Sequence, residues 1–399
     1  MPELRSLIDH LECRACGAVV AADRPVGTCP VCGHTLFAEY RLDRLDAARW
    51  RSDLSQRSAT LWRYRELLPV EHAEAIASLG EGFSAILDLG DLAEAPGIRV
   101  SLKDDGGLPT GSFKARGMTV AVSRARELGL KELFVPSAGN AGVALAAYSA
   151  RARLPARVYL PEETPAPMVQ QCRQYGAEVV RVPGTIREAG VAARAAEAAT
   201  GAFDMSTLRE PYRVEGKKTM GLEIFEQLPG DDLPDAILYP TGGGTGLVGM
   251  AKAFGELRAL GLLERVPRLY AVQPAGCAPV VRALREGSAR VEPWENPRTV
   301  APGLLVPAPF ASERILEAVR STHGGGVTLD DREIVIAMRQ LADRHGVSAS
   351  PEGAAPYAAL ARLSREGAVR PGEHVLLYNT GSGLPFSIDA LELATRGAG

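Results

Sequence analysis

One lysine, Lys114, combines a residue type and a setting that together suggest covalent catalysis. It follows the sequence PTGSF at residues 109–113, where proline and glycine break regular structure, and it precedes a stretch with helical spacing, 118–128. An apolar run at 98–103 predicts a strand before this turn. A lysine held there and shielded from bulk water can have its pKa lowered and attack a carbonyl group to form a Schiff base. A solvated surface lysine is the alternative.

A second motif, SAGN at residues 137–140, lies between an apolar run at 133–136 and a predicted helix. Small residues let a planar ring approach the backbone, and the side-chain amide of Asn140 offers a hydrogen bond to a phenolic oxygen on such a ring. An asparagine in front of a helix is often only a cap, so capping is the competing interpretation.

A glycine-rich motif, TGGGTG at residues 241–246, follows the apolar run 236–240 and precedes a helix. Consecutive main-chain amides with little side-chain bulk, at a helix N-terminus, form a cradle for a phosphate group. A dinucleotide site is the competing interpretation, but the spacing Gly-x-Gly-x-x-Gly fails at Leu247, and the next strand ends on Gln273 instead of an acidic residue. Phosphate is therefore favoured. Its candidate ligands are Gly242, Gly243, Gly244 and Thr245.

A fourth motif, NTGSG at residues 379–383, ends the apolar run 374–378. The hydroxyl of Thr380 could face the pyridine nitrogen of a cofactor ring. An aspartate there would keep that nitrogen protonated and the ring a strong electron sink, whereas a neutral hydroxyl favours eliminations and replacements at the β-carbon. A plain turn is the alternative.

Four of the six cysteines form two Cys-x-x-Cys-Gly knuckles near the N-terminus, a spacing that suits a tetrahedral zinc ion. They are Cys13, Cys16, Cys29 and Cys32. The segment is too short to bury a core, so metal binding would have to hold it folded. Four thiolates close the coordination shell, which predicts a structural Zn²⁺ and leaves His10 and His34 as bystanders. A disulfide pair or an empty site are the alternatives.

The elements around these motifs predict an α/β fold. From about residue 98 onward, short apolar runs alternate with alanine-rich or amphipathic stretches, which is typical of parallel sheets covered by helices on both faces. Ligands of such folds lie beyond the carboxyl ends of the strands, where all of these loops fall. The predicted domains are 1–40, a zinc-ribbon-like segment; 41–117 with 211–399, a larger cofactor-binding domain; and 118–210, a smaller mobile domain that closes over substrate.

The whole-chain composition excludes several classes of protein. The chain has 399 residues, of which 46% are hydrophobic and 23% charged, and its net charge is −3. These values are ordinary for a globular protein and give no reason to expect nucleic acid or an anionic membrane as a partner. No apolar run approaches the length of a membrane span, and the first twelve residues lack the apolar core of a signal peptide. A reducing cytoplasm is therefore the predicted compartment.

Taken together and in this order, the four motifs resemble the fold-type II pyridoxal phosphate enzymes, which include tryptophan synthase β, threonine synthase and the serine and threonine dehydratases. The resemblance extends from about residue 61 to 384. The chain is most similar to the threonine synthases, some of whose relatives also carry an N-terminal cysteine knuckle pair. The segments behind this closer likeness are LWRY at 61–64, LGEG at 79–82 and PYRVEGKKT at 211–219.

This resemblance implies two doubly wound α/β domains, as in tryptophan synthase β, and a homodimer. It also implies roles for the cofactor residues. Lys114 would carry the cofactor as a Schiff base and then move protons, Phe113 would line the ring, and Asn140 would bond its phenolic oxygen. Residues 242–245 would hold the phosphate group, and Thr380 would face the pyridine nitrogen.

On the substrate side, the resemblance implies that Lys103 and Arg213 hold the phosphate or the carboxylate of the substrate, because a cation pairs well with an oxyanion. Either could equally be an exposed charge. The chain departs from the threonine synthase pattern on this side. Ala141-Gly142 stands where those enzymes usually have Thr-Ser, Ala115 replaces the aspartate after the lysine, and the 242–246 loop is closer to the dehydratase type.

Three functions follow as expectations. The first is threonine synthase chemistry, in which a phosphorylated homoserine loses phosphate and water adds at the β-carbon. The second is a simpler β-elimination or replacement, as in a serine/threonine ammonia-lyase or a cysteate synthase-like enzyme. The third is a binding or scaffold protein with an idle fold, which an intact Lys114 argues against.

Overall fold

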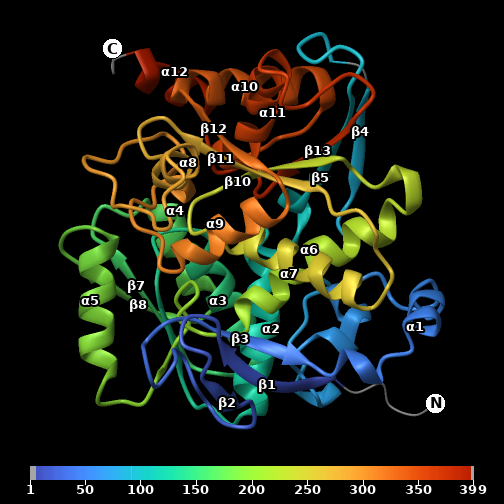
Figure 1. Cartoon of the computed structure of the whole chain (residues 1–399). Helices are drawn as coiled ribbons and strands as arrows, with labels where there is room; N and C mark the ends of the chain where they lie inside the picture. Colours follow the sequence, from blue (N-terminus) through green and yellow to red (C-terminus); the bar gives the residue numbers. More distant parts are fainter. Residues whose placement is uncertain (1–5, 91, 397–399) are drawn as a thin grey trace. The chain divides into compact units, whose positions relative to one another are not determined.

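The structure, a computed structural model, describes residues 6–90 and 92–396 of the chain (Figure 1). These residues form two compact units. Unit 1 consists of the described residues up to Phe83 together with Lys114–Thr219 and Glu256–Leu262, and unit 2 of the described residues in Ser84–Phe113, Met220–Gly255 and Leu263–Gly399. Each unit is described by itself below.

Unit 1 begins with a small antiparallel sheet in the order β2-β1-β3. Its strands are β1 (Ile8–Cys13), β2 (Val19–Ala21) and β3 (Leu36–Tyr40). Few residues of this sheet are fully buried, among them Leu11, Leu36 and Ala38. Such a small apolar core does not stabilise a segment of this length by itself.

A helical stretch follows this sheet in unit 1. It consists of α1 (Ala47–Leu54) and the 3₁₀ helices Leu61–Leu67 and Ala73–Ala75, preceded by the 3₁₀ turn Leu42–Arg44. Its aromatic side chains are part of the core, and their polar ends have partners. The indole of Trp62 donates to Glu81 Oε1 at 3.0 Å, and the indole of Trp50 donates to Glu66 Oε2 at 3.2 Å.

The rest of unit 1 is built on a parallel sheet in the order β8-β7-β6-β9. Its strands are β6 (Leu133–Pro136), β7 (Ala156–Pro161), β8 (Glu178–Val182) and β9 (Phe203–Asp204). Its helices are α2 (Lys114–Glu127), α3 (Asn140–Ala152), α4 (Ala166–Gln174), α5 (Ile186–Glu197) and the start of α6 (Arg213–Gln227). Alanine-rich α3 is buried along most of its length, because small side chains let it pack closely.

Unit 2 is built on a larger sheet in the order β12-β11-β10-β13-β5-β4, in which only the edge strand β4 is antiparallel. The strands are β4 (Ile86–Gly90), β5 (Arg99–Asp104), β10 (Ala236–Pro240), β11 (Arg268–Pro274), β12 (Gly325–Leu329) and β13 (His374–Asn379). Every residue of β10 and β13 is buried, as expected for central strands covered on both faces.

The helices of unit 2 cover both faces of this sheet. They are α7 (Thr245–Ala259), α8 (Pro279–Arg285), α9 (Ser312–Ser321), α10 (Asp331–His345), α11 (Pro351–Arg365) and α12 (Ile388–Arg396), with 3₁₀ turns at Asp105–Gly107, Pro109–Gly111, Gly230–Asp232 and Pro302–Leu304. Ala236 and Leu238 share a core with α10 and α11, whereas the neighbouring Tyr239 contacts Gly246 of α7. Successive residues of a strand point to opposite faces, so α7 and α11 lie on opposite faces (Figure 1).

The predicted α/β class with parallel, helix-covered sheets is confirmed. The apolar run predicted as a strand at 98–103 is β5, and the run at 374–378 is β13. The compact units group residues differently from the predicted domains, since 41–83 belong to unit 1 with the N-terminal sheet and with 114–219. The predicted functional domains stay a prediction. Within the described ranges, no helix combines the length and the apolar composition needed to cross a bilayer.

Candidate active site

Three of the predicted motifs meet at one edge of the sheet of unit 2. Strands β10, β13 and β5 are neighbours and run parallel, with Asn379 paired to Asp104 at their carboxyl ends. β10 continues into the 241–246 loop, β13 into Thr380, and β5 into the turns that lead to Phe113. The structure therefore brings these three predicted cofactor contacts together, where parallel sheets commonly bind ligands.

The turn in front of Lys114 is tight, as predicted. Thr110 has a φ of 63°, in the left-handed region that residues other than glycine rarely adopt. The turn pairs with the segment after β13, because the Phe113 N–H donates to the Thr380 carbonyl at 3.0 Å and Ser112 forms a bridge with Gly381. Lys114 is the next residue along the chain and the first residue of α2.

The glycine loop has no room for larger residues. A Cβ on Gly242 would lie 2.4 Å from the Gly303 carbonyl oxygen, and one on Gly244, whose φ is +70°, would lie 2.3 Å from Ile315 Cδ1. The loop ends at the first residue of α7, so its main-chain N–H groups lie at a helix N-terminus, as a phosphate site requires.

Glu352 has a role that sequence reasoning missed. Its carboxylate accepts a hydrogen bond from the Gly303 N–H at 2.6 Å, and Gly303 in turn lies against Gly242. Glu352 in the first turn of α11 therefore fixes the segment that backs the glycine loop. A carboxylate in a first helical turn is too common in sequences to have revealed this contact.

Lys103 is accounted for without a substrate. Its side chain is completely buried, and its ammonium group forms an ion pair with Glu223 at 2.9 Å. It also donates to the Ser84 carbonyl at 2.8 Å and to Gln227 Oε1 at 2.8 Å. Because three acceptors match the three N–H groups of an ammonium, these contacts assign Lys103 a structural role in unit 2. The exposed-charge alternative is wrong for this residue.

In unit 1, helices α2 and α6 cross with their backbones in contact. A Cβ on Gly216 would lie 2.0 Å from the Arg116 carbonyl oxygen, and one on Gly117 would lie 2.8 Å from the Arg213 carbonyl oxygen. Lys114 and Arg213 are the first residues of these two helices. The crossing therefore brings the backbone of Arg213 to within about one helical turn of Lys114.

Arg213 is buried but uses few of its donors. Its side chain is 3% exposed, and Nη1 donates to the Met205 carbonyl at 2.6 Å. Nε is buried and has no hydrogen-bond partner within the described residues. Burial lowers the pKa of Arg213, while the charges of Glu210 and Asp204 oppose this shift. A buried guanidinium with donors to spare suits an anionic ligand, and the exposed-charge alternative is wrong here too.

Glu210 prepares the start of α6. Its carboxyl group accepts hydrogen bonds from the N–H groups of Tyr212 at 2.7 Å and Arg213 at 3.0 Å. Burial outweighs these donors and the charge of Arg213, and it raises the pKa of Glu210 to about 7. The carboxyl group is thus held beside the backbone of Arg213 without a fixed charge below neutral pH.

Asn140 is not a helix cap. It is the first residue of α3, whose N-cap is Gly139, and the Ser137 hydroxyl accepts from the N–H groups of Gly139 at 3.3 Å and Gly142 at 3.1 Å. The capping interpretation of Asn140 is therefore wrong. Its half-buried side-chain amide makes no hydrogen bond within the part of the chain that the structure describes, and it fits a ligand oxygen.

The predicted residues therefore divide between the two units. Lys114, Asn140 and Arg213 belong to unit 1. Phe113, the glycine loop and Thr380 belong to unit 2. The contacts within each unit are as described, and the roles predicted for the individual side chains stay predictions.

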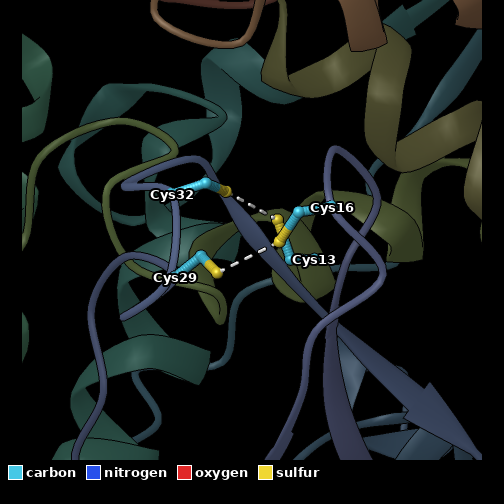
Figure 2. Close-up of side chains that lie close together, drawn as sticks. All are labelled: Cys13, Cys16, Cys29 and Cys32. Carbon is cyan, nitrogen blue, oxygen red and sulfur yellow. Dashed lines mark hydrogen bonds between the residues drawn. The ribbon is translucent and has the colours of Figure 1, made fainter.

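The four N-terminal cysteines form one cluster in unit 1 (Figure 2). Their sulfur atoms all lie within 4.8 Å of one another, with Cys13 and Cys32 at 3.5 Å and Cys16 and Cys29 at 3.7 Å. All four are free thiols, so the disulfide alternative is wrong. A tetrahedral zinc ion with Zn–S bonds of about 2.3 Å places its sulfurs about 3.8 Å apart, which these distances match.

The backbone of each knuckle supports this arrangement. The N–H groups of Gly17 and Gly33 donate to the carbonyls of Cys13 and Cys29, both at 2.8 Å, and both glycines have a positive φ that the turn requires. Burial opposes ionisation of Cys29, but the N–H groups of Cys32 and Val31 prevail and lower the pKa of its thiol to about 7. A thiol that ionises readily is a good metal ligand.

Comparison with known proteins identifies the family. The model of the family described as "Pyridoxal-phosphate dependent enzyme" matches residues 77–381. The chain belongs to this family. The enzyme is 34% identical to a threonine synthase of Methanosarcina acetivorans over 376 residues, 93% of this chain and 91% of that relative. It is 33% identical to a threonine synthase of Methanocaldococcus jannaschii over 374 residues, 93% of this chain and 92% of that relative.

Solved structures agree on the fold. A threonine deaminase from the bacterium abbreviated T.th. has a TM-score of 0.61 and 30% identity, covering 73% of this chain and 89% of that one. Maize serine racemase has a TM-score of 0.65 and 22% identity, covering 75% and 88%. The predicted resemblance and its fold type II architecture are confirmed, and the enzyme is a pyridoxal phosphate-dependent lyase with threonine synthases among its relatives.

The residues present fit this cofactor. The glycine loop offers main-chain N–H groups to its phosphate, and the Asn140 amide is available for its ring oxygen. Lys114 begins a helix beside the turn that carries Phe113. These residues would hold the cofactor, and Lys114 would bind it covalently.

The close crossing of α2 and α6 generates the first prediction. Gly216→Ala will lower the free energy of unfolding by about 1–3 kcal/mol, because a Cβ at this position overlaps the Arg116 carbonyl oxygen. Gly255→Ala in α7 is the control, since a Cβ there meets no atom within 4 Å. That change will stabilise by up to about 1 kcal/mol, the helix-propensity gain of alanine over glycine. Urea unfolding measures both, and equal effects would contradict the crossing.

Glu210 generates a pH prediction. Its pKa of about 7 in the folded chain exceeds the ordinary value of 4.5, so the folded state holds its proton more tightly than the unfolded state. The stability from this group is complete below pH ~4.5 and is lost as the pH rises to ~7, by about 3 kcal/mol in all. Glu210→Gln will remove this part of the pH dependence in urea unfolding between pH 4.5 and 8. An unchanged slope would show that the raised pKa is wrong.

Proposed function

We propose that this enzyme is a threonine synthase, which converts O-phospho-L-homoserine and water into L-threonine and phosphate. Relatives that bear this name match the chain along 93% of its length, well beyond the residues common to the wider family. The match also spans 91% and 92% of those relatives, so the likeness is not limited to one part of them.

Arg213 is the observation within this chain that carries the proposal. Its guanidinium is buried, has an unpartnered Nε, and follows the Glu210-capped turn at the start of α6. Its backbone touches Gly117, one helical turn beyond Lys114. Guanidinium groups bind phosphate and carboxylate with charge-assisted, often paired, hydrogen bonds. A substrate with both groups is therefore the ligand that this residue fits best.

Each residue has a part in the proposed reaction. Bound pyridoxal phosphate supplies an electron sink that makes the C–H bonds of the substrate acidic. Lys114 Nζ takes and returns protons at the substrate carbons, Arg213 holds a substrate oxyanion, and Asn140 fixes the orientation of the ring through its oxygen. The main-chain N–H groups of the glycine loop hold the cofactor phosphate. Water supplies the hydroxyl group of the product as the substrate phosphate leaves.

A second candidate is a β-elimination enzyme, such as a serine/threonine ammonia-lyase or a cysteate synthase-like enzyme. Gly142 favours it, because a Cβ there would lie 2.8 Å from Val158 Cγ1. The hydroxyl that threonine synthases usually place at this position for the substrate phosphate has no room in this chain. The T.th. threonine deaminase, at 30% identity, points the same way. Arg213 would then hold only the substrate carboxylate.

Substrate turnover tests the proposal. Purified holoenzyme will release phosphate and threonine in equal amounts from O-phospho-L-homoserine, which a phosphate assay and amino-acid analysis measure together. Arg213→Ala will lower kcat/KM by about tenfold to a hundredfold, the effect of losing a charge-assisted hydrogen bond. Arg173→Ala, an exposed arginine of α4, is the control and will leave kcat/KM unchanged.

Two outcomes would contradict the proposal. If O-phospho-L-homoserine is inert while serine or threonine yields a 2-oxo acid and ammonia, the enzyme is an ammonia-lyase. If Arg213→Ala turns over the substrate as well as the wild type, the guanidinium does not bind it. The homodimer and the cytoplasmic location predicted from the sequence are part of the same proposal and rest on the resemblance alone.

We also propose that the four-cysteine cluster binds one structural Zn²⁺. The sulfur distances and the glycine turns of both knuckles support it. His34 is not part of the cluster, and its ring nitrogen Nδ1 lies 3.1 Å from the Cys32 carbonyl oxygen. Four thiolates leave no position for substrate, so the ion would hold the fold instead of taking part in the reaction.

Metal analysis tests the zinc proposal. The wild-type protein will contain about one zinc per chain, and the double variant Cys29→Ser/Cys32→Ser will contain none and will lose its cooperative thermal transition at lower temperature. Cys172→Ala, a buried thiol outside the cluster, is the control and will keep its zinc. Wild-type protein that stays free of zinc after growth with added zinc would refute the site.

A further inference from the structure

The second cysteine knuckle holds a side chain that reaches far along the chain. The Cys29 N–H donates to the His34 carbonyl at 2.8 Å, and Thr28 forms an antiparallel bridge with Thr35. Thr35 is thus fixed directly behind the knuckle. Its buried hydroxyl donates to the Leu208 carbonyl at 2.7 Å, across 173 residues of sequence. Both residues belong to unit 1.

Leu208 has a conformation that needs outside support. Its φ is 59°, in the left-handed region, and its side chain is almost completely buried. A left-handed conformation costs a residue with a Cβ roughly 1–2 kcal/mol and persists only where neighbouring groups fix it. The hydrogen bond from Thr35 is one such constraint, and the close approach of Gly27 to the Arg209 carbonyl is another, since a Cβ on Gly27 would lie 3.0 Å from that oxygen.

The turn at Leu208 leads directly to Arg213. Glu210, two residues later, accepts from the N–H of Arg213, and the guanidinium of Arg213 reaches back to the Met205 carbonyl at 2.6 Å. Residues 205–213 therefore form a closed turn whose two ends are joined by Arg213 itself. A change in the backbone at Leu208 moves the segment from which the guanidinium is placed.

The N-terminal sheet also contacts α6 beyond this turn. The Tyr40 hydroxyl donates to Glu215 Oε2 at 2.9 Å, and Lys218 Nζ lies 3.8 Å from the centre of the Tyr40 ring. Lys218 is paired with Glu215 at 2.8 Å, and both side chains are fully buried. The first turns of α6 are thus fixed from the end of β3 as well as from the knuckle.

From these contacts we propose that Thr35 is a positioning residue: the metal-bound N-terminal sheet holds the Leu208 turn through the Thr35 hydroxyl and so sets the position of the Arg213 guanidinium. The inference rests on the proposed role of Arg213 in binding a substrate oxyanion. It gives the zinc knuckles a function at the site, although no cysteine of the cluster touches substrate.

Thr35→Val tests the inference, because it keeps the shape of the side chain and removes the donor. In the holoenzyme, hydrogen–deuterium exchange of the amides in residues 206–213 will become about fivefold faster, the effect of one buried hydrogen bond. KM will rise about fivefold with kcat within about twofold of wild type, and the zinc content will not change. Thr35→Ser keeps the hydroxyl and will restore both values.

Thr28→Val is the matched control in the same knuckle. The Thr28 side chain makes no hydrogen bond within the described residues, so exchange and KM will stay at wild-type values. Unchanged exchange in Thr35→Val would overturn the inference. Faster exchange with an unchanged KM would overturn it too, because Thr35 would then support the fold without placing Arg213. A serine variant that behaves like the valine variant would have the same meaning.

The proposed function and this inference fail separately. If the wild type forms no threonine, the proposed function is wrong, but the exchange measurement still tests the turn. Binding of inorganic phosphate to the holoenzyme, measured by calorimetry, then replaces KM. The inference requires phosphate to bind about fivefold more weakly to Thr35→Val than to wild type and Thr35→Ser, and equal binding to all three would refute it.

Discussion

The crossing of α2 and α6 is the constraint on which the candidate site depends. Two helices approach this closely only where both lack side chains, and Gly117 and Gly216 supply that contact. The crossing lies one turn into α2 and one turn into α6, so it fixes the N-terminal ends from which Lys114 and Arg213 project. Helix N-termini also favour anions, which suits a site for phosphorylated or carboxylated ligands.

Buried charges in this enzyme are of two kinds, and the difference separates support from function. Lys103 and Lys218 are fully buried, and each has carboxylate partners within 2.9 Å, so their charges are neutralised where they lie. Arg213 is almost as inaccessible, but its guanidinium has one carbonyl partner and an unpartnered Nε among the described residues. Removing a charge from water has a large cost unless a partner compensates. A ligand would provide that compensation for Arg213 and has nothing to add at Lys103.

Much of the site could be predicted from sequence because parallel sheets place ligand-binding loops at strand ends. The motifs around Lys114, the glycine loop and Thr380 follow apolar runs that are indeed β5, β10 and β13. Lys103 could not be assigned, because a lysine near the end of a strand has the same sequence signature whether or not a carboxylate lies opposite. Glu352 and Thr35 act through backbone groups of Gly303 and Leu208, and backbone partners leave no pattern in the sequence.

The long reach from Thr35 to Leu208 has a consequence for the order of folding. The knuckles belong to the first part of the chain to be synthesised, and their small sheet depends on metal for its stability. The Leu208 carbonyl appears 173 residues later, and contacts between distant residues form slowly. A sheet already closed around its ion presents a finished surface to the incoming turn. A chain synthesised without metal must search for that contact with both partners unformed, so metal supply governs how fast the enzyme matures.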